Sequence, residues 1–385
     1  MSEAVLPLLV GFEAPPAVKE ALAAMGRTED VRVSPLGDRL AIACYRRDRI
    51  ALADVEVARG ADGVGIAITR VEELSSASLR EPHGLDFLDE ETLAVANRAG
   101  GVGVFRLPAR GSGGELTPLG DGATGPSASD GPGSVAARVH EDGRREVLVC
   151  NNWANTITRH TVAGDGTLAA HEVVAQKWLA VPDGVAISRD GEWLAVSNHS
   201  AHCVFVYARP TLGPDADPVG VLRGVDYPHG LRFDDDDRLL LVADAGAPRV
   251  HLFVPTDEGW EGVRYPVASV EVLDERLFDL AQTSPEEGGP KGIDVFPKAR
   301  VLVVTSESVP LAFFDLERVP DSPANDAALV RYELARLAEQ ARSDGEAAEV
   351  RAELAELRST KAWRLTKPLR AANTVARGLR SGRRA

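Results

Sequence analysis

A unit of about 50 residues recurs along the chain, and this repeat length restricts the fold to a few architectures. Each copy has a Pro-x-Gly turn, a short apolar strand, a polar turn and a second strand that ends on a polar residue. Clear copies begin at Pro82, Pro182, Pro228 and Pro290, and degenerate copies at Thr28 and Gly131. One small sheet cannot bury both faces alone, so β repeats of this length indicate propeller blades that pack radially.

Six copies predict an all-β chain, a six-bladed β-propeller over residues 1–320. Alternating apolar residues such as Leu40 and Ile42, and turns such as Asp190-Gly191, are typical of meandering strands. The sixth copy is one strand short, whereas Val5–Gly11 reads as a spare strand. We therefore expect the N-terminal segment to close the ring as the outer strand of the last blade, because closure removes a free edge.

The first strand of each propeller blade lines the central channel, so the middle residue of each Pro-x-Gly turn should point at the axis. This reasoning gathers Glu29, His83, Asp183, His229 and Lys291 at one mouth of the channel, joined by Ser129 or Asp130 from the third copy. Carboxylates favour Ca²⁺ and imidazoles favour Zn²⁺ or Mn²⁺, so a divalent cation is one interpretation. The alternative is that Lys291 pairs with Asp183 or Glu29 and fills the centre without a metal, or that these polar residues are simply solvated.

Polar residues that end the second strands form another repeated set. They are Asn97, Asn151, Asn198 and Asp244, and we expect them to line the channel as well. His202 stands near the turn that opens a third strand, and we interpret it as a structural residue.

At these residues the chain resembles the six-bladed, calcium-dependent lactonase and esterase superfamily: paraoxonases or arylesterases, gluconolactonases and strictosidine-synthase-like propellers. Thr28-Glu29-Asp30-Val31 is similar to the segment with their acidic calcium ligand, and Pro82-His83-Gly84-Leu85 to the segment with their catalytic-site histidine. Asp183-Gly184 stands where the family has Asn-Gly, and His229 where it has Asp or Asn. The oxygen-ligand set is therefore thinner than that of the family.

The resemblance implies a metal-dependent hydrolase of a lactone or ester, which could be sugar-derived. Its divalent cation, Ca²⁺, would be held by Glu29, Asp130, Asp183 and His229, and would polarise the substrate carbonyl. His83 would act as general base on a water molecule. The alternative is a non-catalytic propeller that binds a ligand for bacterial surface-polysaccharide assembly. In both interpretations a small molecule or glycan occupies the channel, and the fold alone does not choose between them.

The charge of the chain is uneven. It has 43 Lys and Arg against 58 Asp and Glu, for a net charge of −15, yet residues 359–385 hold eight basic residues and no acidic one. The acidic body should repel nucleic acid. No uninterrupted run of about 18 apolar residues occurs, so we expect no membrane-spanning helix. Cys44, Cys150 and Cys203 lie in apolar runs, which favours reduced, buried thiols and the cytoplasm.

The C-terminal part predicts an α-helical extension. Residues 324–358 have the apolar spacing of a short coiled coil, with Val330, Leu334 and Leu337 on one face. Residues 359–385 form a basic amphipathic tail, which resembles a tail of bacterial surface-polysaccharide glycosyltransferases. Trp363, Arg364, Lys367 and Arg370 are its expected contacts with an anionic membrane surface or a polysaccharide-assembly protein. This places the protein peripherally at the inner membrane; docking of the tail on the acidic propeller is the alternative.

Overall fold

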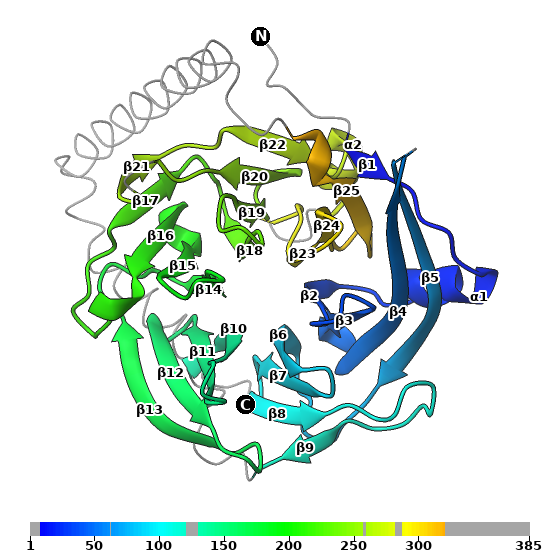
Figure 1. Cartoon of the computed structure of the whole chain (residues 1–385), viewed down its shortest axis with the longest axis horizontal. Helices are drawn as coiled ribbons and strands as arrows, with labels where there is room; N and C mark the ends of the chain where they lie inside the picture. The colour runs from blue at the N-terminus through cyan, green and yellow to red at the C-terminus, as the bar shows by residue number, and fades with distance from the viewer. Residues whose placement is uncertain (1–7, 62, 121–129, 257–258, 282–286, 320–385) are drawn as a thin grey trace, which may run out of the picture. The chain divides into compact units, whose positions relative to one another are not determined.

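The computed structural model describes residues 8–61, 63–120, 130–256, 259–281 and 287–319. Within these residues six β-sheets stand in a ring around a central channel (Figure 1). This arrangement confirms the predicted six-bladed propeller. The predicted coiled-coil segment 324–358 and the basic tail 359–385, with Trp363, Arg364, Lys367 and Arg370, lie outside the described residues.

The first three blades each run from the channel outward in chain order. Blade 1 contains β2 (Thr28–Val33), β3 (Arg39–Cys44), β4 (Arg49–Gly60) and β5 (Gly63–Leu74); blade 2 contains β6 (Pro82–Asp89), β7 (Thr92–Asn97), β8 (Gly101–Arg106) and β9 (Thr117–Leu119); blade 3 contains β10 (Pro132–Val139), β11 (Arg145–Asn151), β12 (Thr156–Val162) and β13 (Leu168–Ala175). The innermost strands begin where the sequence repeats begin.

The other three blades follow the same plan, except that blade 4 has a fifth strand and blade 6 takes its outer strand from the N-terminal segment. Blade 4 contains β14 (Pro182–Ile187), β15 (Trp193–Asn198), β16 (Cys203–Ala208) and β17 (Gly220–Arg223); blade 5 contains β18 (Pro228–Phe233), β19 (Leu240–Asp244), β20 (Arg249–Phe253) and β22 (Ala268–Glu271); blade 6 contains β23 (Ile293–Phe296), β24 (Val301–Val304), β25 (Ala312–Asp315) and β1 (Leu9–Val10). The short strand β21 (Gly262–Arg264) pairs in parallel with β17 and gives blade 4 a fifth strand.

The N-terminal strand joins the last blade. β1 pairs antiparallel with β25, with Leu9 opposite Phe314 and Val10 opposite Phe313. Helix α1 (Pro16–Ala23) follows and buries Val18 and Leu22 in the core shared by blades 1 and 6. A second helix, α2 (Glu275–Ala281), lies between β22 and β23 in the chain. The sequence repeat predicted neither helix, because both fall between copies.

The glycine of the Pro-x-Gly turn is explained by the close approach of the next blade. A Cβ added at Gly184 would lie 2.1 Å from the His229 carbonyl oxygen, and one at Gly230 would lie 2.4 Å from the Lys291 carbonyl oxygen. A Cβ at Gly292 would lie 2.4 Å from Cα of Asp30, which closes the ring between blades 6 and 1. Only glycine permits this spacing, so the turn residue sets how tightly the inner strands converge.

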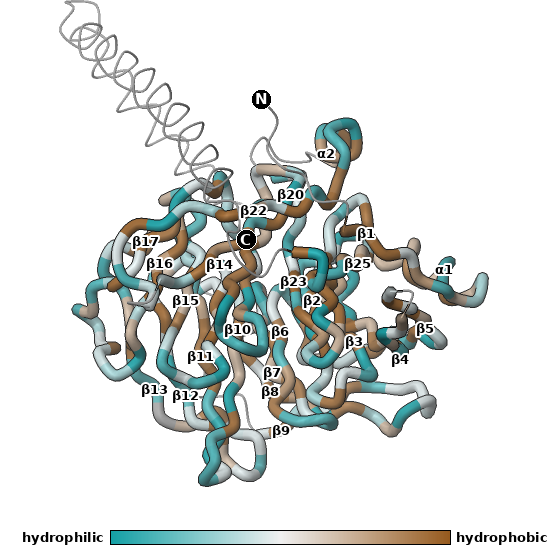
Figure 2. The backbone as a smooth tube through the Cα atoms, turned by 45° about the horizontal axis from the view of Figure 1, so that its top comes forward, coloured by the Kyte–Doolittle hydropathy of each residue, from teal (hydrophilic) through white to brown (hydrophobic). Residues whose placement is uncertain are grey.

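The core consists of apolar layers between neighbouring blades. One layer packs β15 and β16 of blade 4 against β18 and β19 of blade 5, with Trp260 fully buried among them. Figure 2 shows hydrophobic stretches along the strands and hydrophilic stretches at many of the turns. Cys44, Cys150 and Cys203 are buried and free, as the sequence predicted. In the part of the chain that the structure describes, no helix is long and apolar enough to cross a membrane.

Candidate functional site

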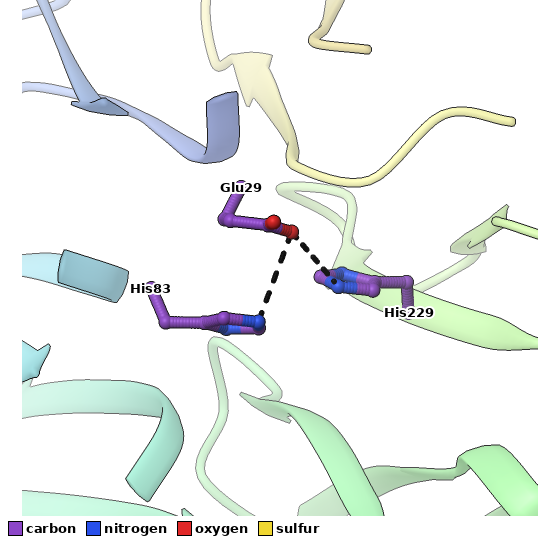
Figure 3. A group of neighbouring side chains, drawn as sticks. All are labelled: Glu29, His83 and His229. Carbon is purple, nitrogen blue, oxygen red and sulfur yellow. Dashed lines mark ion pairs between the residues drawn. The ribbon is translucent and has the colours of Figure 1, made fainter. Parts of the chain in front are cut away.

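Three ionisable side chains from different blades meet on the channel axis (Figure 3). Glu29 comes from β2, His83 from β6 and His229 from β18. Nε2 of His229 lies 3.4 Å and Nε2 of His83 lies 3.7 Å from Oε2 of Glu29. One ligand atom of each residue lies within 4.8 Å of the others, and all three side chains are buried. These residues could therefore share a metal ion.

Two more of the predicted residues join this group. Oδ2 of Asp183 lies 3.2 Å from Nε2 of His229, and Nζ of Lys291 lies 3.1 Å from Oε2 of Glu29. Lys291 also pairs with Glu287 at 2.6 Å. We call Glu29, His83, Asp183, His229, Glu287 and Lys291 the mouth cluster. The repeat thus predicted which side chains of distant segments lie together, apart from Glu287.

The predicted ligand Asp130 is not part of the mouth cluster. The inner strand of blade 3 begins at Pro132, so its residue next to the axis is Gly133. The space that a side chain would take there is filled by Asn152, whose Nδ2 donates to Oδ1 of Asp183 at 2.8 Å. Asp130 precedes the strand by two residues, and its carbonyl oxygen accepts the backbone N–H of Trp153. Blade 3 therefore contributes an amide where the sequence predicted a carboxylate.

The second predicted set, Asn97, Asn151, Asn198 and Asp244, does not line the channel cavities. The side chains of Asn97 and Asn198 accept the backbone N–H of Arg80 and Ala180, in the loops before their own inner strands. Asp244 accepts the N–H groups of the loop before β18, and Asn151 donates to threonines of β12. Because these side chains turn back to satisfy loop backbone, they stabilise each blade internally.

The residue after three of these strand ends, at Asn97, Asn151 and Asn198, lines a cavity instead. A cavity of about 230 Å³ opens beside the mouth cluster. Tyr45, Arg98, Asn152 and His199 each follow the last residue of a second strand and contribute to its wall, together with Arg27, His83, Val181, Asp183 and Glu287. Arg98, Asn152 and His199 each stand one position after a residue of the predicted set. The alternation of a strand does not show which way the side chain just beyond its end will point.

His83 does not suit the predicted role of general base. Its Nδ1 lies 2.7 Å from the Gly133 carbonyl oxygen, so Nδ1 carries the proton, and Nε2 accepts a hydrogen bond from Arg98 at 2.6 Å. Burial, and then the positive charge of Arg98, lower the pKa of His83 to about 3. The imidazole therefore stays neutral at neutral pH with its lone pair occupied.

His199 presents a different imidazole to the cavity. It begins the short 3₁₀ helix His199–Ala201 after β15. Its Nδ1 lies 3.3 Å from the Pro228 carbonyl oxygen and 4.0 Å from Oδ2 of Asp183, and its Nε2 lies 3.4 Å from Oε1 of Glu287. His199 thus lies in the cavity wall with oxygen atoms near both ring nitrogens and two carboxylates beside its ring.

His202, three residues later, is exposed; its Nδ1 contacts the Asp226 carbonyl oxygen and its ring packs on Tyr227. These contacts agree with the structural role predicted for it.

The carboxylates of the mouth cluster are ionised. Burial alone would raise the pKa of Glu29, but Lys291, His83, His229 and Arg27 together hold it well below its ordinary value. Burial likewise opposes ionisation of Asp183, yet His229, His83, Arg98 and His199 lower its pKa. Lys291 and His229 lower the pKa of Glu287 against the same penalty. Such acidic groups are weak proton acceptors, so they are better suited to stabilising a cation than to acting as bases.

The cluster does not suit the predicted Ca²⁺. Calcium takes six to eight oxygen ligands, but two of the three groups that could share an ion are imidazoles. Both oxygens of Glu29 already face cations, because Arg27 pairs with Oε1 and Lys291 with Oε2. A carboxylate and imidazole set fits Zn²⁺ or Mn²⁺ better, although these same cations would compete with the ion.

Comparison with known proteins locates a lactonase-type segment. Residues 99–214 match the family described as lactonase, 7-bladed beta-propeller. Among solved structures, the chain is similar to a candidate gluconolactonase at 17% identity, with 76% of this chain and 89% of that chain covered and a TM-score of 0.49. It is also similar to a candidate 6-phosphogluconolactonase from Bacteroides fragilis at 18% identity, 62% and 71% coverage and a TM-score of 0.43.

A luciferin-regenerating enzyme is similar at 12% identity, with 76% of this chain and 92% of that chain covered and a TM-score of 0.47. No curated protein matches the chain. The matched family has seven blades, whereas the sheets described here number six, so the match concerns the repeat and not the size of the ring. The chain is a six-bladed β-propeller that, over residues 99–214, is similar to the lactonase propellers.

Proposed function

We propose that this protein hydrolyses a small lactone or ester in the cavity at the channel mouth. The match of residues 99–214 to a lactonase family supports this reaction class. The observation that carries the proposal is the position of His199, an imidazole in the wall of a polar cavity whose ring lies next to the carboxylates of Glu287 and Asp183. The predicted Ca²⁺ has no part in the proposal, because the donor atoms do not suit it.

In the proposed reaction, Nε2 of His199 removes a proton from a water molecule as the water oxygen attacks the substrate carbonyl carbon. The imidazolium that forms is stabilised by the carboxylates of Glu287, at 3.4 Å, and Asp183, at 4.0 Å. When the tetrahedral intermediate collapses, the bond from the carbonyl carbon to the ester oxygen breaks. The leaving alkoxide takes the proton back from His199, and the product of a lactone is a hydroxy acid.

Arg98 is the proposed donor to the oxyanion. Its guanidinium lines the cavity, bonds His83 and lies 3.4 Å from Asp183. A donor held in place before reaction can stabilise the negative charge that develops on the carbonyl oxygen. His83 would then serve as a positioning residue that orients Arg98.

Two exposed tryptophans support a sugar-derived substrate. Trp153 directly follows the cavity residue Asn152, and Trp178 precedes the cavity residue Val181 by three positions; their exposed fractions are 55% and 66%. Nε1 of Trp178 donates to Asp217 at 3.0 Å and Lys177 lies over its ring, whereas Ser78 occupies this position in the corresponding loop of blade 2. Trp178 also adopts φ of 65°, which is strained for a bulky residue. We propose that these rings pack against the apolar face of a sugar ring.

The test is kcat/KM on a panel of sugar lactones, simple lactones and aryl esters, with His199→Gln as the variant. We expect a loss of about 10²- to 10⁴-fold, because a general base contributes that range. His202→Gln is the matched control, since it removes an exposed imidazole three residues away. Wild-type activity in His199→Gln would refute the proposed base, and absence of turnover across the panel would refute the hydrolase itself.

A further inference from the structure

We infer that the Lys291 ammonium is the resident cation of the mouth cluster and occupies the place that the sequence suggested for a divalent ion. The inference concerns what neutralises the buried carboxylates, so it does not depend on the proposed hydrolysis. Its basis is the position of Lys291, its contacts and the balance of charge around it.

The repeat aims Lys291 at the axis. It is the middle residue of the Pro-x-Gly turn in the sixth copy of the repeat. His83, Asp183 and His229 hold the same position in the turns of their own copies. Its backbone is held on both sides, because its N–H donates to Thr305 and its carbonyl oxygen accepts from Gly230. The side chain is 4% exposed. A long flexible lysine buried in this way must be compensated, since an unpaired buried charge is costly.

Its ammonium contacts two carboxylates. Nζ lies 3.1 Å from Oε2 of Glu29 and 2.6 Å from Oε2 of Glu287. Oε2 of Glu29 is buried, and among the described residues no group donates a well-aligned hydrogen bond to it. The charge on that oxygen is therefore compensated by proximity to Nζ and to the imidazoles. A metal ligated by Glu29 would need the same oxygen, so ion and ammonium exclude each other.

The carboxylates of the cluster are already paired without an ion. Within the described residues, Glu29, Asp183 and Glu287 face the side-chain cations Arg27, Arg98 and Lys291, and Nε2 of His229 lies 3.4 Å from Glu29 and 3.2 Å from Asp183. A further divalent cation would leave this buried group with an excess of positive charge. Removing the ammonium would leave Oε2 of Glu29 without the cation that faces it, while Arg27 would still pair with Oε1.

The test is the substitution Lys291→Met in the full chain, which keeps the length of the side chain and removes its charge. Binding of MnCl₂ and CaCl₂ is measured by titration calorimetry, and Tm is measured with and without each salt. We expect wild type to bind neither ion and to keep its Tm. Lys291→Met should have a lower Tm that MnCl₂ raises and CaCl₂ does not, because Glu29 and the two imidazoles favour Mn²⁺.

Lys298→Met is the matched control, since it removes an exposed lysine from the turn between β23 and β24. It should behave as wild type. Stoichiometric retention of a divalent ion by wild-type protein would overturn the inference. So would a Lys291→Met protein with unchanged Tm and no gain in Mn²⁺ binding.

If Lys291→Met does not fold, the double variant Glu29→Gln/Lys291→Met decides the question. It removes both members of the pair, so recovery of a folded protein supports the inference. Failure of the double variant to fold would count against it. Hydrolase activity is not a readout in any arm, so these outcomes are distinguishable from failure of the proposed reaction.

Discussion

The inner strands carry two buried charged clusters, and comparing them separates structural charge from functional charge. One is the mouth cluster. The other, which we call the inner cluster, consists of Asp30, Arg32, Asp86, Arg232 and Asp294. Both come from different blades, and both combine carboxylates with cations.

The carboxylates of the inner cluster join one blade to the next. Asp30 accepts the N–H of Leu85 at 3.0 Å, Asp86 accepts the N–H of Ala137 at 2.8 Å, and Asp294 accepts the N–H of Val33 at 2.8 Å. The guanidinium of Arg232 bridges Asp86 and Asp294. The carboxylates of this cluster therefore hydrogen-bond to backbone N–H groups of the neighbouring blade and hold adjacent blades together.

The mouth cluster differs in what its carboxylates contact. Glu29, Asp183 and Glu287 pair with side chains, and the cavity lies beside them. Unpartnered polar atoms do not separate the two clusters, because Nε of Arg32 in the inner cluster lacks a hydrogen-bond partner among the described residues just as Oε2 of Glu29 does. The comparison teaches that buried charge in a channel indicates a site where its side chains border the cavity instead of accepting backbone N–H groups.

Substitution in the inner cluster should have the largest effect on stability. Asp86→Ala leaves the Ala137 N–H without its acceptor and removes a carboxylate from Arg232. We expect a loss of about 3–5 kcal/mol in the free energy of unfolding, measured by urea denaturation, because breaking a buried ion pair strands its partner. Asp142→Ala, in an exposed pair with Arg144, is the control and should leave the midpoint unchanged. An equally small effect of Asp86→Ala would remove the contrast between the clusters.

Substitution at the mouth should affect activity more than stability. Arg98→Met removes the proposed oxyanion donor, and we expect kcat to fall about 10²- to 10³-fold with a smaller change in KM. Its unfolding midpoint should fall less than that of Asp86→Ala, because the guanidinium of Arg98 bonds the side chains of His83 and Asp183, whereas Asp86 holds a backbone N–H of the next blade. Arg98→Lys should restore part of kcat; a change confined to KM would instead assign Arg98 to substrate binding.

A buried titratable group outside both clusters provides the smallest expected effect. Burial, and then His171, lower the pKa of His160 in blade 3 to about 4. The folded state keeps this imidazole neutral while the unfolded chain takes up a proton below about pH 6.5. Its contribution to stability is therefore present above that pH and is lost as the pH falls toward 4. In His160→Gln, the pH slope of unfolding free energy should be flatter by about one proton in this window.

An unchanged slope in His160→Gln would show that this imidazole is not held neutral by the fold.

Much of the candidate site follows from the repeat. Glu29, His83, Asp183, His229 and Lys291 occupy one position of a recurring turn, so symmetry alone predicts that they converge. The third copy shows where this reasoning fails. Its degenerate turn does not show which residue stands in the middle position, and the residue next to the axis, Gly133, lies three positions after the predicted Asp130. Asn152, which fills the space beside Gly133, has no counterpart in the repeat.

The cavity residues Arg98, Asn152 and His199 could not be predicted with the same tools. Strand alternation assigns side chains to faces only while the strand lasts. Beyond Asn97 and Asn198, direction depends on the turn, and those two side chains fold back because their oxygens accept loop N–H groups. Glu287 lies outside the repeat, and only its contacts with Lys291 and His199 reveal its place.

The sequence alone determined the number of blades, the strand that begins each one and the position in each repeat that faces the axis, because these depend on local periodicity. Tertiary structure decided which charges pair, which imidazole lies in the cavity wall and where the cavity opens. Those properties depend on distances of a few ångströms between residues that are far apart in the chain, and periodicity carries no information about such distances.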